Sequence, residues 1–379
     1  MLEVQKWLRE QNGNLELLEK QLGISNVLHD DGRVILNYSQ IDSPKTNKIV
    51  RECRGLILDR FNNWNLVARS FPRFFNWGEN LEDQRNFEWD RCRAEEKVDG
   101  SLIVCHHFNG EWHINTRGSF GQGLVNDFVS WRQLFELAIP PNFFSALNPE
   151  YTYIFELCSL YNKIVRSYEK PTLFLLTVFC AESEIDLKSV EDQSNFIGVQ
   201  RPDVLFFSDI YDLTLYIENK SNNDPTFEGM VLVDQNNLRI KVKSPKYLVL
   251  HKLHNNGHIS IDSLVNIVMY KEDDEFLVYF KELKPQFDLI KNEIAKARKE
   301  IDNLWFCYHD EPSRKKFALS VVPSKWSSFL FKAKDTGEHP IELFNKNRPL
   351  VSKILEKILT KQLESLKLGN RQKDLNAKV

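Results

Sequence analysis

The chain has 379 residues, of which 42% are hydrophobic and 27% charged, a composition that fits a folded globular protein and excludes wholesale disorder. Its formal net charge of −3 is uneven, because residues 251–379 carry +5 and residues 1–250 carry −8. No run approaches the roughly 20 apolar residues of a membrane span, and the first residues show no signal-peptide pattern, so we expect an intracellular protein.

The first 250 residues predict one helix followed by many short strands. Hydrophobic residues recur at helical spacing over residues 4–22, and Gly23 is a suitable end for that helix. Asn109-Gly110 between two β-rich runs predicts a hairpin. Further helices are expected near 124–138 and 187–196. Strands are predicted at residues 33–38, 55–59, 66–69, 94–98, 102–108, 112–116, 152–157, 173–180, 229–233 and 238–242. This part therefore reads as an α+β domain with mostly antiparallel sheets.

From about residue 250 the pattern becomes helical. Runs rich in Lys, Glu, Leu and Ile predict helices, and Pro285 and Pro312 interrupt or bound them. The predicted helical stretches are residues 259–271, 274–308, 313–334 and 340–368. We place a boundary near residues 252–257, which divides the chain into an α+β domain (1–252) and an all-α domain (253–379).

The end of this helical part is its most basic stretch. Its positive residues are Lys353, Lys357, Lys361, Lys367, Arg371, Lys373 and Lys378. Basic segments favour polyanions, which makes the domain a candidate for binding nucleic acid. A solvated helix face with a frayed tail explains the same charges equally well.

Neither the six cysteines nor the histidines predict a metal site. The cysteines form no CxxC pair and lie at no zinc spacing from a histidine. His251, His254 and His258 are spaced loosely, and a polar linker accounts for them better than a zinc site.

The most distinctive local motif is Lys97-Val98-Asp99-Gly100-Ser101, which lies between two predicted strands. Gly100 lets the backbone turn and lets a ligand approach closely. A lysine held neutral by nearby positive charge or desolvation is a nucleophile, and attack on the α-phosphate of a nucleoside triphosphate gives a lysyl–nucleotide phosphoramidate. An exposed turn with a solvated lysine is the plain alternative.

Other groups that this chemistry needs occur in a definite order around the motif. Nucleotidyl transfer requires cations for the phosphates, carboxylates for metal and sugar, and an apolar slot for the base. The motifs are Glu52-Cys53-Arg54-Gly55, residues 69–76 (RSFPRFFN), Arg117-Gly118-Ser119, Phe155-Glu156, Glu228-Gly229-Met230-Val231 and residues 241–247 (KVKSPKY). Alternation places Lys241 and Lys243 on one face of a strand.

This set of motifs resembles the covalent nucleotidyltransferases, and most closely the bacteriophage T4 RNA ligase 1 family. The resemblance covers residues 50–250 and implies an ATP-dependent RNA ligase that carries AMP on Lys97, uses Mg²⁺ or Mn²⁺, and joins 5′-phosphate and 3′-hydroxyl RNA ends. Cleaved tRNA is the substrate that it suggests. The all-α part would hold the RNA.

The resemblance also implies a role for each site residue. Lys97 would be the nucleophile and Glu228 would act at the metal ion, with Lys241 and Lys243 completing the catalytic set. The nucleotide would be bound by Arg54, Arg73, Asp99, Ser101, Arg117, Glu156, Leu176, Val231, Lys241 and Lys243: cations on the phosphates, Glu156 on the ribose, and Leu176 and Val231 on either side of adenine. Arg73 and Arg117 stand where the phage enzyme has lysine, which keeps the charge but changes the hydrogen-bond geometry.

Several residues have ordinary structural explanations. Glu156 and Glu228 would fit structural ion pairs, Arg54 a structural salt bridge, and Lys241 with Lys243 a solvated strand face. Residues 74–77, rich in aromatics, are expected to pack in a core rather than stack on bases.

Two rival functions remain. One is another nucleotidyltransferase, either a DNA ligase or an mRNA capping enzyme, but these carry an OB-fold where this chain is helical. The other is a non-catalytic RNA-binding protein on the same scaffold, which would have no chemical reason to keep Lys97 together with Glu228, Lys241 and Lys243.

Overall fold

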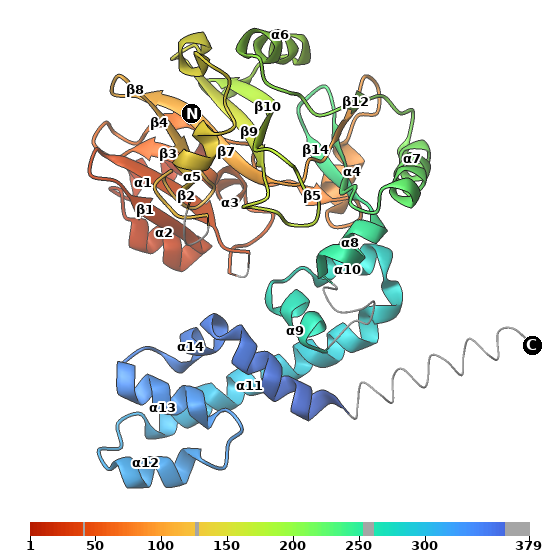
Figure 1. Ribbon diagram of the computed structural model, residues 1–379. Coiled ribbons are helices and arrows are strands. Elements are labelled where there is room, and N and C mark those ends of the chain that lie inside the picture. The colour runs from red at the N-terminus through yellow and green to blue at the C-terminus, as the bar shows by residue number, and fades with distance from the viewer. Residues whose placement is uncertain (41, 126–128, 253–260, 361–379) are drawn as a thin grey trace, which may run out of the picture. The chain divides into compact units, whose positions relative to one another are not determined.

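A computed structural model describes residues 1–40, 42–125, 129–252 and 261–360 (Figure 1). The chain divides into two compact units, Met1–His251 and Lys252–Val379. The first unit is α+β and the described residues of the second are helical, which confirms the predicted fold class. Among the residues described, no helix has both the length and the apolar character needed to cross a membrane.

Three sheets build the first unit. The first has the order β1-β2-β3-β4, with bounds Ile24–Leu28, Arg33–Tyr38, Arg54–Asp59 and Asn65–Ala68. The second has the order β11-β10-β9-β7-β8, with bounds Ser183–Glu184, Thr172–Cys180, Tyr151–Cys158, Ser101–Phe108 and Glu111–Asn115. The third has the order β12-β6-β13-β14-β5, with bounds Val204–Leu205, Arg93–Glu96, Gly229–Val233, Arg239–Lys243 and Phe75–Asn76. Among the named strands of the described residues, every pairing is antiparallel except that of β14 with β5.

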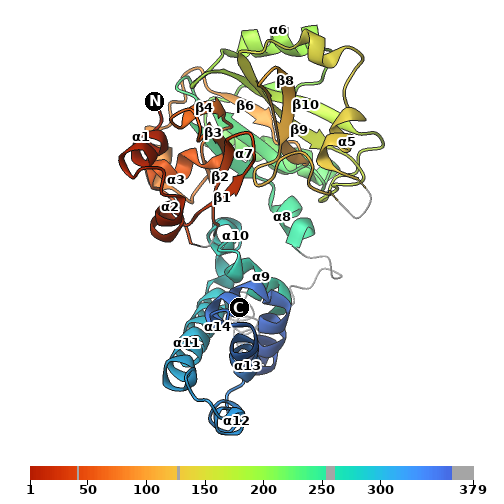
Figure 2. The same cartoon turned by 90° about the vertical axis from the view of Figure 1, so that its left-hand side faces the viewer.

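Helices cover these sheets. The helices of this unit are α1 (Glu3–Glu10), α2 (Leu15–Leu22), α3 (Lys48–Glu52), α4 (Leu81–Asn86), α5 (Trp131–Glu136), the 3₁₀ turn η1 (Phe143–Ala146), α6 (Leu187–Ile197), α7 (Ile210–Asn223) and α8 (Pro245–Lys252). Figures 1 and 2 both show α6 beside β10. The single helix predicted over 4–22 is wrong, because Asn12 and Gly13 take positive φ and break it into α1 and α2.

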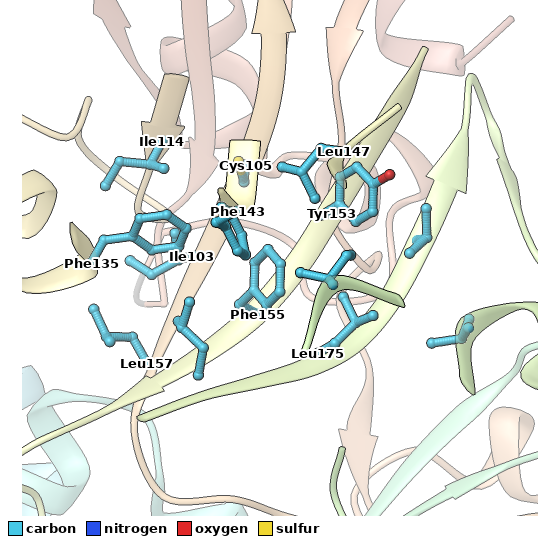
Figure 3. Packing of buried hydrophobic residues seen from close by; sticks show 14 of the residues in the cluster. Ile103, Cys105, Ile114, Phe135, Phe143, Leu147, Tyr153, Phe155, Leu157 and Leu175 are labelled. Carbon is cyan, nitrogen blue, oxygen red and sulfur yellow. The ribbon is translucent and has the colours of Figure 1, made fainter. Parts of the chain in front are cut away.

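The core of the second sheet is aromatic (Figure 3). Phe135 from α5 and Phe143 from η1 meet Phe155 of β9, with ring centroids 5.6 to 6.0 Å apart. These rings are buried, and burying a phenylalanine side chain contributes ~1.5–3 kcal/mol. The packing fixes β9 and its neighbour β7, whose ends carry Glu156 and Ser101.

The second unit is built from helices alone over its described residues 261–360. They are α9 (Ile261–Met269), α10 (Asp273–Tyr279), the turn η2 (Lys281–Leu283), α11 (Lys284–Tyr308), α12 (Arg314–Val321), α13 (Ser327–Thr336), α14 (Pro340–Lys346) and a final helix over 348–360. Three predicted helices proved too long. Residues 274–308 break at η2, just before Pro285, residues 313–334 break near Pro323, and the run from 340 breaks at Asn347. His254, His258 and the basic residues beyond 360 lie outside the described residues.

Candidate active site

Lys97 begins the turn that joins β6 to β7 and lines a cavity of about 480 Å³ in the first unit. Its backbone N–H donates to the carbonyl of Gly229 at 2.9 Å, which ties the turn to β13. Its amine donates to a Glu228 carboxylate oxygen at 2.8 Å, and the Lys243 amine lies 3.5 Å from the other oxygen. Glu228 is buried and the Lys97 side chain is 25% exposed. Lys97 is therefore a partly exposed amine held against a buried carboxylate that it shares with Lys243.

Two glycines make this arrangement sterically possible. A Cβ at Gly100 would lie 2.6 Å from the Cys158 sulfur and from the Leu157 carbonyl oxygen. Gly229 has φ +132°, and a Cβ there would lie 2.2 Å from the Val242 carbonyl oxygen. Only glycine lets these backbones approach so closely, so each motif needs its glycine for packing.

Arg54, Arg73 and Arg117 gather on one side of the cavity, near Tyr38. The guanidinium carbons of Arg73 and Arg117 lie 4.4 and 4.9 Å from the ring centroid. Gly55 has φ +72°, and a Cβ there would lie 2.9 Å from the Cα of Arg117. Glycine therefore lets the two backbone segments at residues 55 and 117 approach each other closely. Three positive side chains held this close favour an anion between them.

Two of these arginines have unsatisfied nitrogens. One buried nitrogen of Arg54 and one of Arg73 lack a hydrogen-bond partner within the described parts of the chain. Burial lowers the pKa of both groups, although an arginine stays charged at neutral pH. A buried polar atom without a partner costs free energy, so these nitrogens are suited to a bound oxyanion.

Glu156 faces the cavity from β9, opposite Leu102 of β7. Burial raises the pKa of its carboxyl to about 7, and the neighbouring charges of Lys97 and Arg54 oppose that rise. Ser101 also lines the cavity, and its hydroxyl accepts a hydrogen bond from the Asn162 amide at 3.0 Å. This wall offers a carboxyl group and a hydroxyl group to a sugar.

The apolar part of the cavity comes from Leu176 and Val231, with Phe71 and Phe74. β10 pairs irregularly with β9 at Leu176, and Arg201 donates to the carbonyls of Leu175 and Leu176 at 3.1 and 2.5 Å. That contact stabilises the bulge. An apolar slot beside charged groups suits a nucleobase.

The structure brings most of the predicted site residues to this cavity. Those that line it are Arg54, Lys97, Ser101, Arg117, Glu156, Leu176, Val231, Lys241 and Lys243. Glu228 and Arg73 contact lining residues, Lys97 and Tyr38 respectively.

Asp99 is placed differently. Its buried carboxylate accepts hydrogen bonds from the Tyr247 hydroxyl and from the backbone N–H groups of Val165 and Arg166, all at 2.9 Å. Two of these three donors belong to the loop that follows β9, and Asp99 is not among the residues that line the cavity, so its contact with a nucleotide stays a prediction. Asp99 therefore fixes the backbone around Lys97.

Some lining residues were not predicted. Tyr38, Phe71 and Glu95 all line the cavity. Glu95 is buried, and its Oε1 oxygen lies 2.7 Å from Nε of Arg93 and 3.5 Å from Nη2 of Arg201. The position of Glu95, two residues before Lys97, could have identified it as a site residue. No sequence feature distinguishes Tyr38 from the other aromatic residues in strands. The Phe74 ring centroid lies 5.6 Å from the guanidinium carbon of Arg54 and 5.2 Å from the amine nitrogen of Lys241. Phe74 also packs against a buried apolar cluster and Phe75 is buried, which agrees with the core packing predicted for these aromatics.

The described residues contain no group of three or more histidine, cysteine, aspartate or glutamate side chains close enough to hold a metal ion. The carboxylates nearest the Lys97 amine are Glu228, which contacts it, and Glu156, which lines the cavity. Magnesium is commonly held by one or two carboxylates together with substrate phosphates, and this arrangement fits that mode.

The chain is similar to known proteins in sequence and in structure. A family model described as RNA ligase matches residues 52–247. A protein of Autographa californica nuclear polyhedrosis virus, described as a putative bifunctional polynucleotide kinase/RNA ligase, is 34% identical over 271 residues, which are 66% of this chain but only 38% of that protein. An RNA ligase of Rhodothermus phage RM378 is 25% identical over 388 residues and covers 82% of this chain and 86% of its own. A solved archaeal ATP-dependent RNA ligase is 15% identical, with a TM-score of 0.48 and coverage of 72% and 69%.

Proposed function

The chain belongs to the RNA ligase family, whose model matches just over half of it, and on that premise we propose that it is an ATP-dependent RNA ligase working through a lysyl-AMP intermediate. One observation carries the proposal: the amine of Lys97 lies at the wall of a cavity that also holds Arg54, Arg117, Lys241 and Lys243. Cations arranged around a nucleophile are the arrangement that phosphoryl transfer requires.

In the first step, the neutral amine of Lys97 attacks the α-phosphorus of ATP. A P–N bond forms, the bond to the bridging oxygen breaks, and pyrophosphate leaves. The amine lies 2.8 Å from a Glu228 carboxylate oxygen, and it must be neutral, with its lone pair free, before it attacks. Lys243 already compensates part of the Glu228 charge from the other side. Mg²⁺, when bound at Glu228, would add Lewis-acid stabilisation of the phosphates.

The second and third steps use the same cavity. A phosphate oxygen of the RNA 5′ end attacks the lysyl-AMP, and the amine of Lys97 leaves. A 3′-hydroxyl then attacks the activated 5′ end, and AMP leaves.

We propose Glu156 as the ribose partner, Leu176 and Val231 as the adenine slot, and Arg54 with Arg73 as phosphate ligands. Asp99 and Ser101 then hold the turn and the cavity wall.

We further propose that the second unit binds RNA, with broken tRNA as the physiological substrate and repair as the purpose. The support is the +5 charge of residues 251–379 and the helical content of that unit over its described residues. The same helical content argues against a DNA ligase or a capping enzyme, which would carry a β-barrel after Lys243.

The test of this function is an end-joining assay with matched substrates. The purified chain and its Lys97→Ala variant would be given ATP or GTP with Mg²⁺ and labelled strands of RNA or DNA. Each strand would carry a 5′-phosphate and a 3′-hydroxyl. We expect joining of RNA with ATP by the unaltered chain alone. A nucleotide adduct that forms with GTP and not with ATP would indicate a capping enzyme. Efficient joining of DNA and not of RNA would indicate a DNA ligase. Binding of RNA without joining or adduct would indicate a non-catalytic protein.

A further inference from the structure

The loop of residues 159–171, between β9 and β10, is tied closely to the turn that carries Lys97. Besides the two backbone N–H groups bound by Asp99, the Asn162 amide donates to the Ser101 hydroxyl at 3.0 Å. The Arg166 guanidinium lies 2.8 Å from a carboxylate oxygen of Glu96. Polar anchors therefore bind this loop at residues 96, 99 and 101, on both sides of the nucleophile. We call it the anchored loop.

The anchored loop also turns large apolar side chains toward solvent. Leu160 is 58% exposed, Tyr161 51% and Ile164 38%. A surface loop normally exposes polar side chains, and clustered exposed apolar groups indicate a binding surface. The polar anchors hold these side chains in place before any ligand arrives, so less ordering entropy is lost on binding.

The charge of the anchored loop identifies its partner. Residues 159–171 contain Lys163, Arg166 and Lys170 against a single acidic residue, Glu169, while residues 1–250 as a whole carry −8. Arg166 is paired with Glu96, so Lys163 and Lys170, both exposed, are the cations that this loop offers to a partner. A basic, aromatic surface inside an acidic unit is complementary to a single-stranded nucleic acid, which offers phosphates to the cations and unstacked bases to the ring. An apolar protein partner would not require the added positive charge.

From these observations we propose that the anchored loop binds the 5′-phosphorylated end of the RNA strand, with the first bases stacked on Tyr161 and the phosphates near Lys163. This proposal rests on the proposed ligase function and names the surface that presents its second substrate. The anchoring to Glu96, Asp99 and Ser101 explains why the RNA end would be presented at Lys97. Nucleotide binding itself does not need Tyr161, because that residue does not line the cavity.

The experiment separates the loading of AMP from its transfer. The full chain and variants Tyr161→Ala, Tyr161→Trp and Lys163→Ala would first be loaded with labelled ATP without RNA. Each lysyl-AMP form would then be mixed with a short 5′-phosphorylated oligoribonucleotide whose 3′ end is blocked. Tyr211→Ala on α7 is the matched control, since Tyr211 is 71% exposed and lies outside the cavity and the loop.

We expect all variants to load AMP within twofold of the unaltered chain. Tyr161→Ala should transfer AMP to subsaturating RNA about tenfold more slowly, the effect of losing one stacked base, and Tyr161→Trp should retain the rate. Lys163→Ala should reduce the salt dependence of transfer.

Equal transfer by Tyr161→Ala and Tyr211→Ala would overturn the loop proposal alone and leave a protein partner as the alternative. Loss of loading in Tyr161→Ala would also overturn it. Failure of the unaltered chain to transfer AMP at all would overturn the ligase function as well.

Discussion

In the first unit, Met1–His251, charged side chains such as Arg73, Glu95 and Glu228 are buried, whereas the described residues of the second unit bury mainly apolar groups. Within residues 261–360, the buried polar residues are Asp273, Gln286, Ser324 and Ser352. Burying charge costs free energy unless a partner compensates it. In the first unit, Glu95 lines the cavity, Arg73 packs on Tyr38 and Glu228 contacts Lys97, so part of this buried charge lies at the candidate site. The described part of the second unit is organised mainly by apolar packing.

The largest expected effect follows from removing the charge at the centre of the first unit. Glu228→Gln keeps the shape of the side chain but removes the charge between Lys97 and Lys243. We expect lysyl-AMP formation to slow by about 10²–10³-fold, the usual effect of losing one group that organises charge in an active site. Single-turnover loading with labelled ATP measures it. Glu218→Gln, exposed on α7, is the matched control, and equal rates in the two variants would contradict the contrast drawn between the units.

The second unit should respond in the opposite way. Phe344 is fully buried and its ring centroid lies 5.4 and 5.5 Å from those of Trp326 and Phe329. Phe344→Ala should lower the free energy of unfolding of this unit by about 3 kcal/mol yet leave lysyl-AMP formation unchanged. Urea denaturation and ATP loading measure the two effects. Phe306→Ala, at an 82% exposed position, should change neither, and a loss of loading in Phe344→Ala would show that the units are not separate in function.

A smaller effect should appear in the pH dependence of stability. The pKa of Glu156 is about 7 in the folded protein, above its ordinary value of 4.5, because burial disfavours the carboxylate. Between those two pH values the folded state binds more protons than the unfolded state, so this group's contribution to stability falls as pH rises toward 7 and stays lost above it. Glu156→Gln should therefore gain stability relative to the unaltered chain, by on the order of 2 kcal/mol at pH 8 and little at pH 4. Urea denaturation at both pH values tests this, and a pH-independent difference would contradict it.

The smallest effect concerns a surface feature of the first unit that lies outside the cavity. Asp209 caps α7 by accepting a hydrogen bond from the Asp212 backbone N–H at 2.9 Å. Asp209→Ala should lower the free energy of unfolding by about 1 kcal/mol without slowing AMP loading, whereas Asp209→Asn should retain the cap. Thermal denaturation of the three proteins measures the difference. Slower AMP loading by Asp209→Ala would contradict this prediction, because it would show that a surface residue outside the cavity affects the reaction.

The strands of the first unit were largely predictable from sequence. All ten predicted strands are present within two residues of their expected bounds, because short apolar runs bounded by turn signals are typical of buried strands. The strands not predicted are β1, β5, β11 and β12. Three of them, β5, β11 and β12, have two residues each, which is too short to show a period. β5 and β12 also depend on partner strands distant in sequence.

The site was predictable where charge interrupts an apolar pattern. Glu156 and Glu228 stand out for that reason, and both lie beside Lys97 as expected, although their roles stay proposals. Tyr38 and the anchored loop were not predictable. Tyr38 acquires its place only when Arg73 and Arg117 fold against it, and the loop is defined by hydrogen bonds to Asp99 that no local pattern encodes. Helix α7 was also missed, because its sequence (IYDLTLYIENKSNN) carries β-branched and aromatic residues with weak helical propensity.

The most direct test of the central claim is to locate the nucleotide on the chain. The purified protein would be stripped with pyrophosphate, incubated with ATP and Mg²⁺ without RNA, digested, and mapped by mass spectrometry, with Lys97→Ala and the exposed-lysine variant Lys188→Ala in parallel. We predict an AMP adduct on Lys97 in the unaltered chain and in Lys188→Ala, and none in Lys97→Ala. An adduct that persists in Lys97→Ala, or that maps to another residue, would contradict the account.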